Sequence, residues 1–288
     1  MSGPFRRTLV PAGPYFAEAL GPGLWHRRLY PGGRAGPNGE TSLPTPGGQA
    51  WSEQILLGGA EDPPPRPLLP DIRLPANQYW PLHWHDSWTA VLVVEGQCLV
   101  GDWWMERDDL LLVAPGIEYG PLLAGPQGVR LFEIFSDLGG ARGGYAPEYR
   151  DHPTLAGGEH HFAPRSPRNR ANEGRQTRPL AGVEGIRRER LAAGREWRLG
   201  ASGEAVVPRL ACFALSPGQE WDAPGPVRDF QLWVLWEGLA AVAGRVLCAD
   251  DLLLAEPGAR LPRLRAGAEG VRWLVLSRSE AILLEGTP

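Results

Sequence analysis

The chain has 288 residues, of which 43% are hydrophobic, and this is enough apolar material for a packed core. Its 38 glycines and 30 prolines favour short strands joined by tight turns over a helical bundle, and they predict an all-β fold. The formal charge of −4 argues against a nucleic-acid-binding protein. No run approaches the roughly 18 apolar residues of a membrane span, so no membrane association is expected.

Residues 1–60 contain the turn-rich segments GPG, YPGG and TPGG, and they are expected to form an extended N-terminal arm. The apolar run that follows the first two arginines is interrupted by Pro11 and Gly13, which argues against a signal peptide. The three cysteines, Cys98, Cys212 and Cys248, are too scattered for a disulfide framework. We therefore expect a cytoplasmic protein.

An internal repeat defines the expected architecture. Residues 71–136 align with residues 213–278 at a constant offset of 142 and without a gap. The shared anchors are Glu95-Gly96 with Glu237-Gly238, the Asp-Asp-Leu runs at 108–110 and 250–252, and Pro115-Gly116 with Pro257-Gly258. A period this long is not that of a solenoid and predicts two domains in tandem, over residues 61–136 and 206–288. Residues 137–205, rich in Gly, Pro and Arg, are expected to be a linker.

Each copy contains short apolar runs separated by turn signals. In the first copy these runs are TAVLVVEG, LLLVAPG and VRLFEIF, and each has a counterpart in the second copy. Strands at such close spacing are typical of a sandwich or barrel.

The first copy resembles the cupin family. The first cupin motif consists of a glycine, an HxH pair, a glutamate and a glycine, and the second motif ends in a histidine after a proline-glycine turn. At these spacings the chain has Asn77, His83 with His85, Thr89, Gly96 and Tyr119. The family's glutamate and its second histidine are thus replaced by Thr89 and Tyr119. The resemblance implies two tandem jelly-roll-like cupin barrels, the first with a metal site.

Strand alternation predicts the metal ligands. His83 and His85 have the same parity and would point to one side of an extended segment. Their imidazoles suit a divalent transition metal such as Fe, Cu, Mn, Ni or Zn. Glu133 stands where the second copy has Val275, and it is the candidate third ligand and catalytic carboxylate. The alternatives are a pair of core histidines or a ligand pocket without metal and, for Glu133, an edge salt bridge or a neutral acid with a raised pKa.

Four residues are candidates for substrate contact. Tyr119 is a poor ligand for Zn or Mn, so we assign its hydroxyl a catalytic or substrate-binding role, together with Thr89. Trp84 and Trp104 belong to a group of tryptophans near the histidines that could form an aromatic pocket. The same tryptophans would equally suit the core or the interface of a homodimer.

The second copy lacks this ligand set. The equivalents of His83, His85, Thr89 and Tyr119 are Gly225, Val227, Gln231 and Leu261. We therefore expect no metal there, and a structural or interface role for this domain.

The leading hypothesis is a metal-dependent bicupin enzyme that acts on a small organic molecule, foremost an oxygenase such as a dioxygenase. The first alternative is a non-catalytic bicupin with an effector-binding or structural role. The second is a metal-assisted isomerase or lyase that uses Glu133 as its base.

Overall fold

The computed structural model describes residues 18–28, 51–57, 64–74, 76–80, 82–137, 143–145, 179–204, 206–279 and 282. Every helix or strand assigned within these ranges is a β-strand, and the predicted all-β class is confirmed. No helix in this part of the chain is long and apolar enough to cross a membrane.

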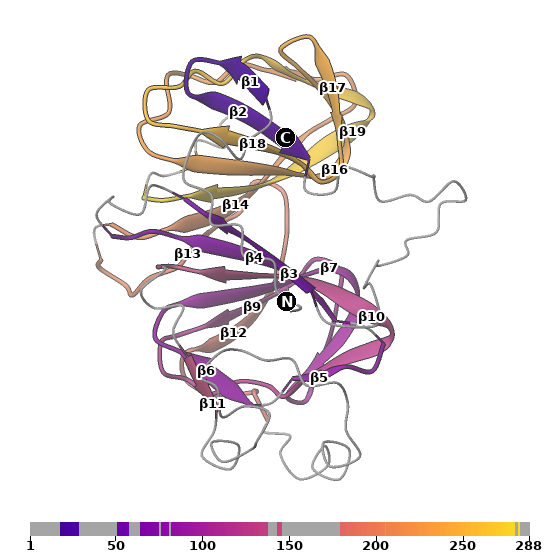
Figure 1. The fold of residues 1–288 in the computed structure, drawn as a ribbon, viewed down its shortest axis with the longest axis vertical. Helices are drawn as coiled ribbons and strands as arrows, with labels where there is room; N and C mark the ends of the chain where they lie inside the picture. Colours follow the sequence, from indigo (N-terminus) through magenta and orange to yellow (C-terminus); the bar gives the residue numbers. More distant parts are fainter. Residues whose placement is uncertain are drawn as a thin grey trace, which may run out of the picture. The chain divides into compact units, whose positions relative to one another are not determined.

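The chain forms two compact units, the first built mainly from residues 68–190 and the second mainly from residues 191–288. In the first unit the described strands form an eight-stranded sheet in the order β12-β9-β7-β10-β4-β3, with β5 on β10 and β8 on β7 (Figure 1). Their bounds are β3 Trp51–Leu56, β4 Leu68–Leu74, β5 Tyr79–Trp80, β7 Thr89–Val100, β8 Trp103–Glu106, β9 Asp109–Val113, β10 Leu122–Phe135 and β12 Ile186–Arg190. Strands β6 (His83–His85) and β11 (Gly143–Tyr145) pair with each other in a separate small sheet.

In the second unit the described strands form a nine-stranded sheet in the order β1-β2-β18-β16-β19-β14-β13, with β15 on β19 and β17 on β16. Their bounds are β1 Glu18–Gly21, β2 Leu24–Arg28, β13 Glu196–Arg198, β14 Arg209–Leu215, β15 Glu220–Trp221, β16 Gln231–Val242, β17 Arg245–Cys248, β18 Asp251–Ala255 and β19 Leu264–Ser277. Figure 1 shows the N-terminal hairpin β1-β2 beside β18, far from it in sequence.

Segments expected to be arm and linker therefore supply strands. From residues 1–60, β1 and β2 extend the second sheet and β3 the first. From residues 137–205, β12 pairs with β9 and β13 pairs with β14. These edge strands satisfy backbone groups of the repeated sheets that would otherwise be unpaired.

The repeat seen in the sequence is reproduced strand by strand. Strands β7 to β10 and β16 to β19 have the same lengths, and the two sets of bounds differ by 142 throughout. The Oδ2 atom of Asp109 accepts a hydrogen bond from the Glu106 amide at 2.9 Å, and that of Asp251 accepts one from Cys248 at 2.7 Å. An acid at this point closes the same turn in both copies.

The glycine shared by the two copies lies inside a long strand, Gly96 in β7 and Gly238 in β16, and it has a steric reason there. Gly96 has φ 74° and Gly238 has φ 83°, a region that glycine adopts readily. A Cβ atom on Gly96 would lie 2.3 Å from the Gly128 oxygen, and one on Gly238 would lie 2.2 Å from the Gly270 oxygen. The long neighbouring strands can approach this closely only without a side chain.

Each sheet is an open path of paired strands, and its buried side chains form an apolar core. In the first unit the core includes side chains from β4, β5, β7, β8, β9, β10 and β12. Tyr119 and Trp80 belong to this core, so the candidate site lies at its edge.

Candidate metal centre

Strand β6 presents the two histidines to the interior. His83 and His85 are 1% and 2% exposed, whereas Trp84 between them is partly exposed. The backbone of His83 exchanges two hydrogen bonds with that of Tyr119, at 3.2 and 2.9 Å, and the His85 carbonyl accepts one from Gly116 at 2.7 Å. The alternation expected from the sequence therefore holds, and main-chain bonds define its register.

Glu133 of β10 brings a carboxylate to the histidines. Its Oε1 atom lies 3.8 Å from Nε2 of His83 and 3.5 Å from Nε2 of His85. Ligand atoms of these three buried residues lie within 4.8 Å of one another. Residues about 50 positions apart in sequence thus form one His-His-Glu group.

Tyr119 completes this cluster. Its hydroxyl, on a fully buried ring, donates a hydrogen bond of 2.5 Å to the same Oε1 atom of Glu133. Burial raises the pKa of Tyr119 well above its ordinary value, and the charge and hydrogen bond of Glu133 raise it further. The phenol therefore keeps its proton and acts as a donor.

The carboxyl of Glu133 is held in its charged form. Burial acts to raise its pKa, but the imidazoles of His83 and His85 that face the carboxyl outweigh burial and hold the pKa well below its usual range. An ionised carboxylate is the form that ligates metal.

The donor set fits a divalent transition metal. Ligand atoms bonded at about 2.1 Å would lie about 3.0 Å apart at octahedral angles and about 3.4 Å apart at tetrahedral angles. The observed separations of 3.5 and 3.8 Å from Glu133 exceed the upper end of that range by about 0.1 and 0.4 Å, a difference that a small side-chain rotation closes. Two imidazoles and one carboxylate are the set found in non-haem Fe(II) oxygenases, with further positions left for substrate.

Aromatic rings surround the group. Trp80 stacks on His83 with centroids 5.2 Å apart and planes 6° apart. Phe135 lies 4.6 Å from the His85 ring, and Tyr119 lies 4.4 Å from the His83 ring. Phe135 was not among the predicted site residues, although it is two positions after Glu133 on the same strand and therefore on the same face.

No family model matches the chain, and no curated protein matches it. Among solved structures, one from Nostoc punctiforme, provisionally described as a dioxygenase, is 12% identical with a TM-score of 0.51, and the match covers 83% of this chain and 85% of that one. The chain has the cupin fold. At this level of identity the likeness shows the fold alone.

Two further solved structures match the chain with lower TM-scores. Oxalate decarboxylase from Bacillus subtilis is 15% identical with a TM-score of 0.43, over 74% of this chain and 68% of that one. The pirin YhhW from Escherichia coli, in complex with nickel(II), is 12% identical with a TM-score of 0.45, over 90% of this chain and 92% of that one.

Within the first cupin domain, the predicted substrate residues lie in different surroundings. Thr89 is buried and donates its hydroxyl hydrogen to the Ser87 carbonyl at 3.2 Å. Trp84 has the opposite parity to the histidines, so its ring points to the other face of β6. Trp104 lies on β8 and is 54% exposed. Of the four residues proposed for substrate contact, Tyr119 is the one that the structure joins directly to the His-His-Glu group.

The second cupin domain keeps the backbone of the site without its ligands. The bond from the Gly116 amide to the His85 carbonyl recurs as a bond of 2.7 Å from Gly258 to Val227. At the place of Glu133 stands Val275, which is fully buried in an apolar cluster. The same strand geometry therefore presents different chemistry in the two domains.

Proposed function

We propose that the chain is a metal-dependent bicupin oxygenase that acts on a small organic molecule, with His83, His85 and Glu133 as the ligands of a divalent metal, ferrous iron foremost. The observation that carries this proposal is the convergence of three buried ligand atoms within 4.8 Å. An iron ion held there would supply a redox centre with open positions for dioxygen and substrate.

In this proposal Tyr119 is a positioning residue. Its hydroxyl donates to Oε1 of Glu133, which defines the rotamer of the carboxylate before a metal arrives. Such supporting bonds orient ligands and typically change metal affinity by about 10- to 100-fold when removed. The high pKa of the buried phenol keeps this donor protonated near neutral pH.

The aromatic rings exclude water from the group. Trp80 covers one face of His83 and Phe135 lies against His85, so both imidazoles are packed on apolar surface. Water exclusion strengthens the electrostatic interactions among the ligands and limits side reactions.

One observation favours the non-catalytic alternative. His83, His85 and Glu133 are at most 3% exposed, so a substrate reaches the group only if neighbouring side chains move. A buried cluster of one acid and two histidines can also have a purely structural role. A measurement of metal affinity distinguishes the metal-dependent enzyme from the non-catalytic alternative.

The first test is calorimetric titration of chelator-treated protein with Fe(II) in the absence of oxygen. We expect one ion per chain, and Glu133→Gln should lower the affinity more than about 100-fold, since loss of a ligand exceeds the loss of a supporting residue. Glu106→Gln is the matched control, because Glu106 is an exposed glutamate of the same domain that pairs with Arg190. Wild-type protein that binds neither Fe nor Cu, Mn, Ni or Zn would refute the enzymatic proposal.

The second test measures oxygen consumption by the iron-loaded protein over a panel of small phenols, enols and carboxylates. Turnover of any member should be lost in His83→Ala and retained in Glu106→Gln. Metal binding without oxygen uptake would instead direct attention to isomerase or lyase chemistry at the same group.

A further inference from the structure

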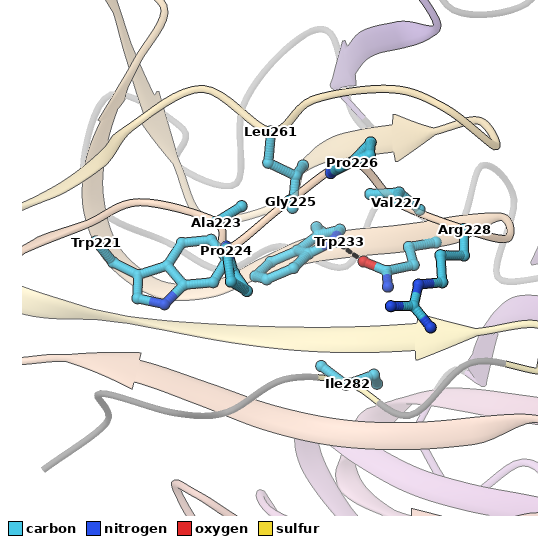
Figure 2. Close-up of a pocket in the computed structure, with 11 residues that line it drawn as sticks. Trp221, Ala223, Pro224, Gly225, Pro226, Val227, Arg228, Trp233, Leu261 and Ile282 are labelled. Carbon is cyan, nitrogen blue, oxygen red and sulfur yellow. Dashed lines mark hydrogen bonds between the residues drawn. The ribbon is translucent and has the colours of Figure 1, made fainter.

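The second cupin domain contains a pocket of about 590 Å³ at the place where the first domain has its histidines. Figure 2 shows its residues, which include Gly225, Val227 and Leu261, the equivalents of His83, His85 and Tyr119. A volume of this size lies within the range of pockets that hold small organic ligands.

Tryptophans form the floor of this pocket. Trp233 stands at the repeat position of Val91, and its ring lies 5.8 Å from that of Trp221 and 5.5 Å from that of Phe213. Trp273 stands at the repeat position of Leu131, and its ring centroid lies 6.1 Å from that of Trp233. Two large rings thus fill the interior where the first domain has aliphatic side chains, and of the tryptophans Trp221 and Trp233 line the pocket.

The polar groups of the pocket are hydrogen-bond donors. Gln231, at the position of Thr89, is 6% exposed, and its Oε1 accepts the indole hydrogen of Trp233 at 3.1 Å. This bond turns the amide so that its NH2 group remains available, and among the described residues no other side-chain hydrogen bond of Gln231 is found. The guanidinium of Arg228 adds a positive charge, and none of the described lining residues is an aspartate or glutamate.

The apolar and charged parts lie at different ends. In Figure 2 the ring of Trp233 lies between that of Trp221 and the guanidinium of Arg228. A ligand that fits this arrangement has a flat apolar body and an anionic head, since a carboxylate accepts from both amide and guanidinium donors.

We propose that the second cupin domain binds a flat organic carboxylate without a metal, with its ring system against Trp221 and Trp233 and its carboxylate at Gln231 and Arg228. This site is separate from the metal centre, so it does not depend on the proposed oxygenase activity. It assigns the duplicated domain a ligand-binding role of its own.

The test uses the whole 288-residue chain after chelator treatment, so that no metal can bind the carboxylate in the first domain. Calorimetric titrations compare 1-naphthoate with 1-naphthalenemethanol and 1-naphthylmethylamine, which share the ring and differ in charge. We expect naphthoate to bind at least about 10-fold more tightly than the alcohol, as charge-assisted hydrogen bonds would give, and the amine to bind most weakly. Equal binding of all three, or the tightest binding by the amine, would overturn the proposal.

Variants locate the site. A Cβ atom on Gly225 meets nothing within 4 Å, so Gly225→Phe should fill the pocket without disturbing the fold and lower naphthoate affinity at least about 10-fold. Gly21→Phe is the matched control, since Gly21 is also open to a Cβ but lies on β1 outside the pocket. Unchanged affinity in Gly225→Phe would refute the site.

An added negative charge tests the recognition chemistry. Gln231→Glu keeps the acceptor for the Trp233 indole and removes the donors, so it should weaken naphthoate about 10-fold or more and leave the alcohol within about 2-fold. His83→Ala should leave naphthoate binding unchanged. If His83→Ala loses naphthoate binding and Gln231→Glu keeps it, then naphthoate binds in the first domain and the proposal is overturned.

Discussion

Replacing Tyr119 with phenylalanine tests the hydrogen bond at the centre of the candidate site. The hydroxyl donates at 2.5 Å to Oε1 of Glu133, and the tyrosine and the glutamate are 0% and 3% exposed. Phenylalanine keeps the ring and its packing 4.4 Å from His83, so no cavity forms and the change isolates the bond. Glu133 would then retain its buried charge with one donor fewer.

The expected loss follows from the charge of the acceptor. A hydrogen bond to a charged group contributes about 1.5 to 3 kcal/mol, so Tyr119→Phe should lower the free energy of unfolding by about 2 kcal/mol. For a domain of this size that corresponds to a fall of about 4 to 8 °C in melting temperature. Scanning calorimetry of chelator-treated protein would follow the transition of the first domain.

Thr89→Val provides the matched control. It removes a buried hydroxyl of the same domain, but one that donates at 3.2 Å to a neutral carbonyl, so we expect a loss of only about 1 kcal/mol. If Tyr119→Phe loses less than about 0.5 kcal/mol, or less than Thr89→Val, then the bond to an ionised Glu133 does not form in solution.

Two further predictions concern the second domain. Gly238→Ala should lower the free energy of unfolding by more than about 3 kcal/mol, because the new Cβ would lie 2.2 Å from the Gly270 oxygen. Gly258→Ala is the control: Gly258 has φ 88° but no atom within 4 Å of the new Cβ, so the loss measured by urea denaturation should be about 1 kcal/mol. Similar losses in both would contradict the steric argument. The pKa of His26 is raised, chiefly by its hydrogen bond to Asp251. The protonated imidazole therefore contributes its full stabilisation below about pH 6.5, and this contribution is lost as the pH rises through the folded-state pKa. The stability difference between wild type and His26→Gln should therefore be larger at pH 5.5 than at pH 8.5, and a larger difference at pH 8.5 would refute the assignment.

Much of the fold follows from local signals. Turn residues and alternating apolar runs recur at the offset of 142, and the strands of the two copies begin and end at that offset. Gly96 could be recognised as a shared anchor because it follows a glutamate in both copies, but it lies within β7 and not at a turn. The structure adds the reason, which is the approach of the Gly128 backbone from a strand 32 residues later.

The edges of the sheets could not be derived in the same way. Strands β1, β2 and β12 have no counterpart in the repeat and lie in segments that resemble arm and linker by composition. A strand edge offers the same backbone donors and acceptors to any partner, so the choice of β18 or β9 depends on the whole tertiary arrangement.

For the candidate site, parity was sufficient to place His83 and His85 on one face, and the contrast with Val275 identified Glu133. Tyr119 stood out because it occupies the family's histidine position. Its bond to Glu133 was not foreseeable, since side-chain distances across two strands depend on register and twist. The tryptophans near the histidines in sequence lie in different surroundings, since Trp104 faces solvent whereas Trp80 stacks on His83.

The sequence by itself determined the all-β class, the duplication and the face on which the two histidines lie, because turn chemistry and strand alternation act over a few residues. Only the tertiary structure decided that Glu133 and Tyr119 meet at one oxygen atom, and that Trp233 and Gln231 line a pocket where the first domain has imidazoles. Those contacts join strands far apart in the chain, and packing of the whole core sets their distances.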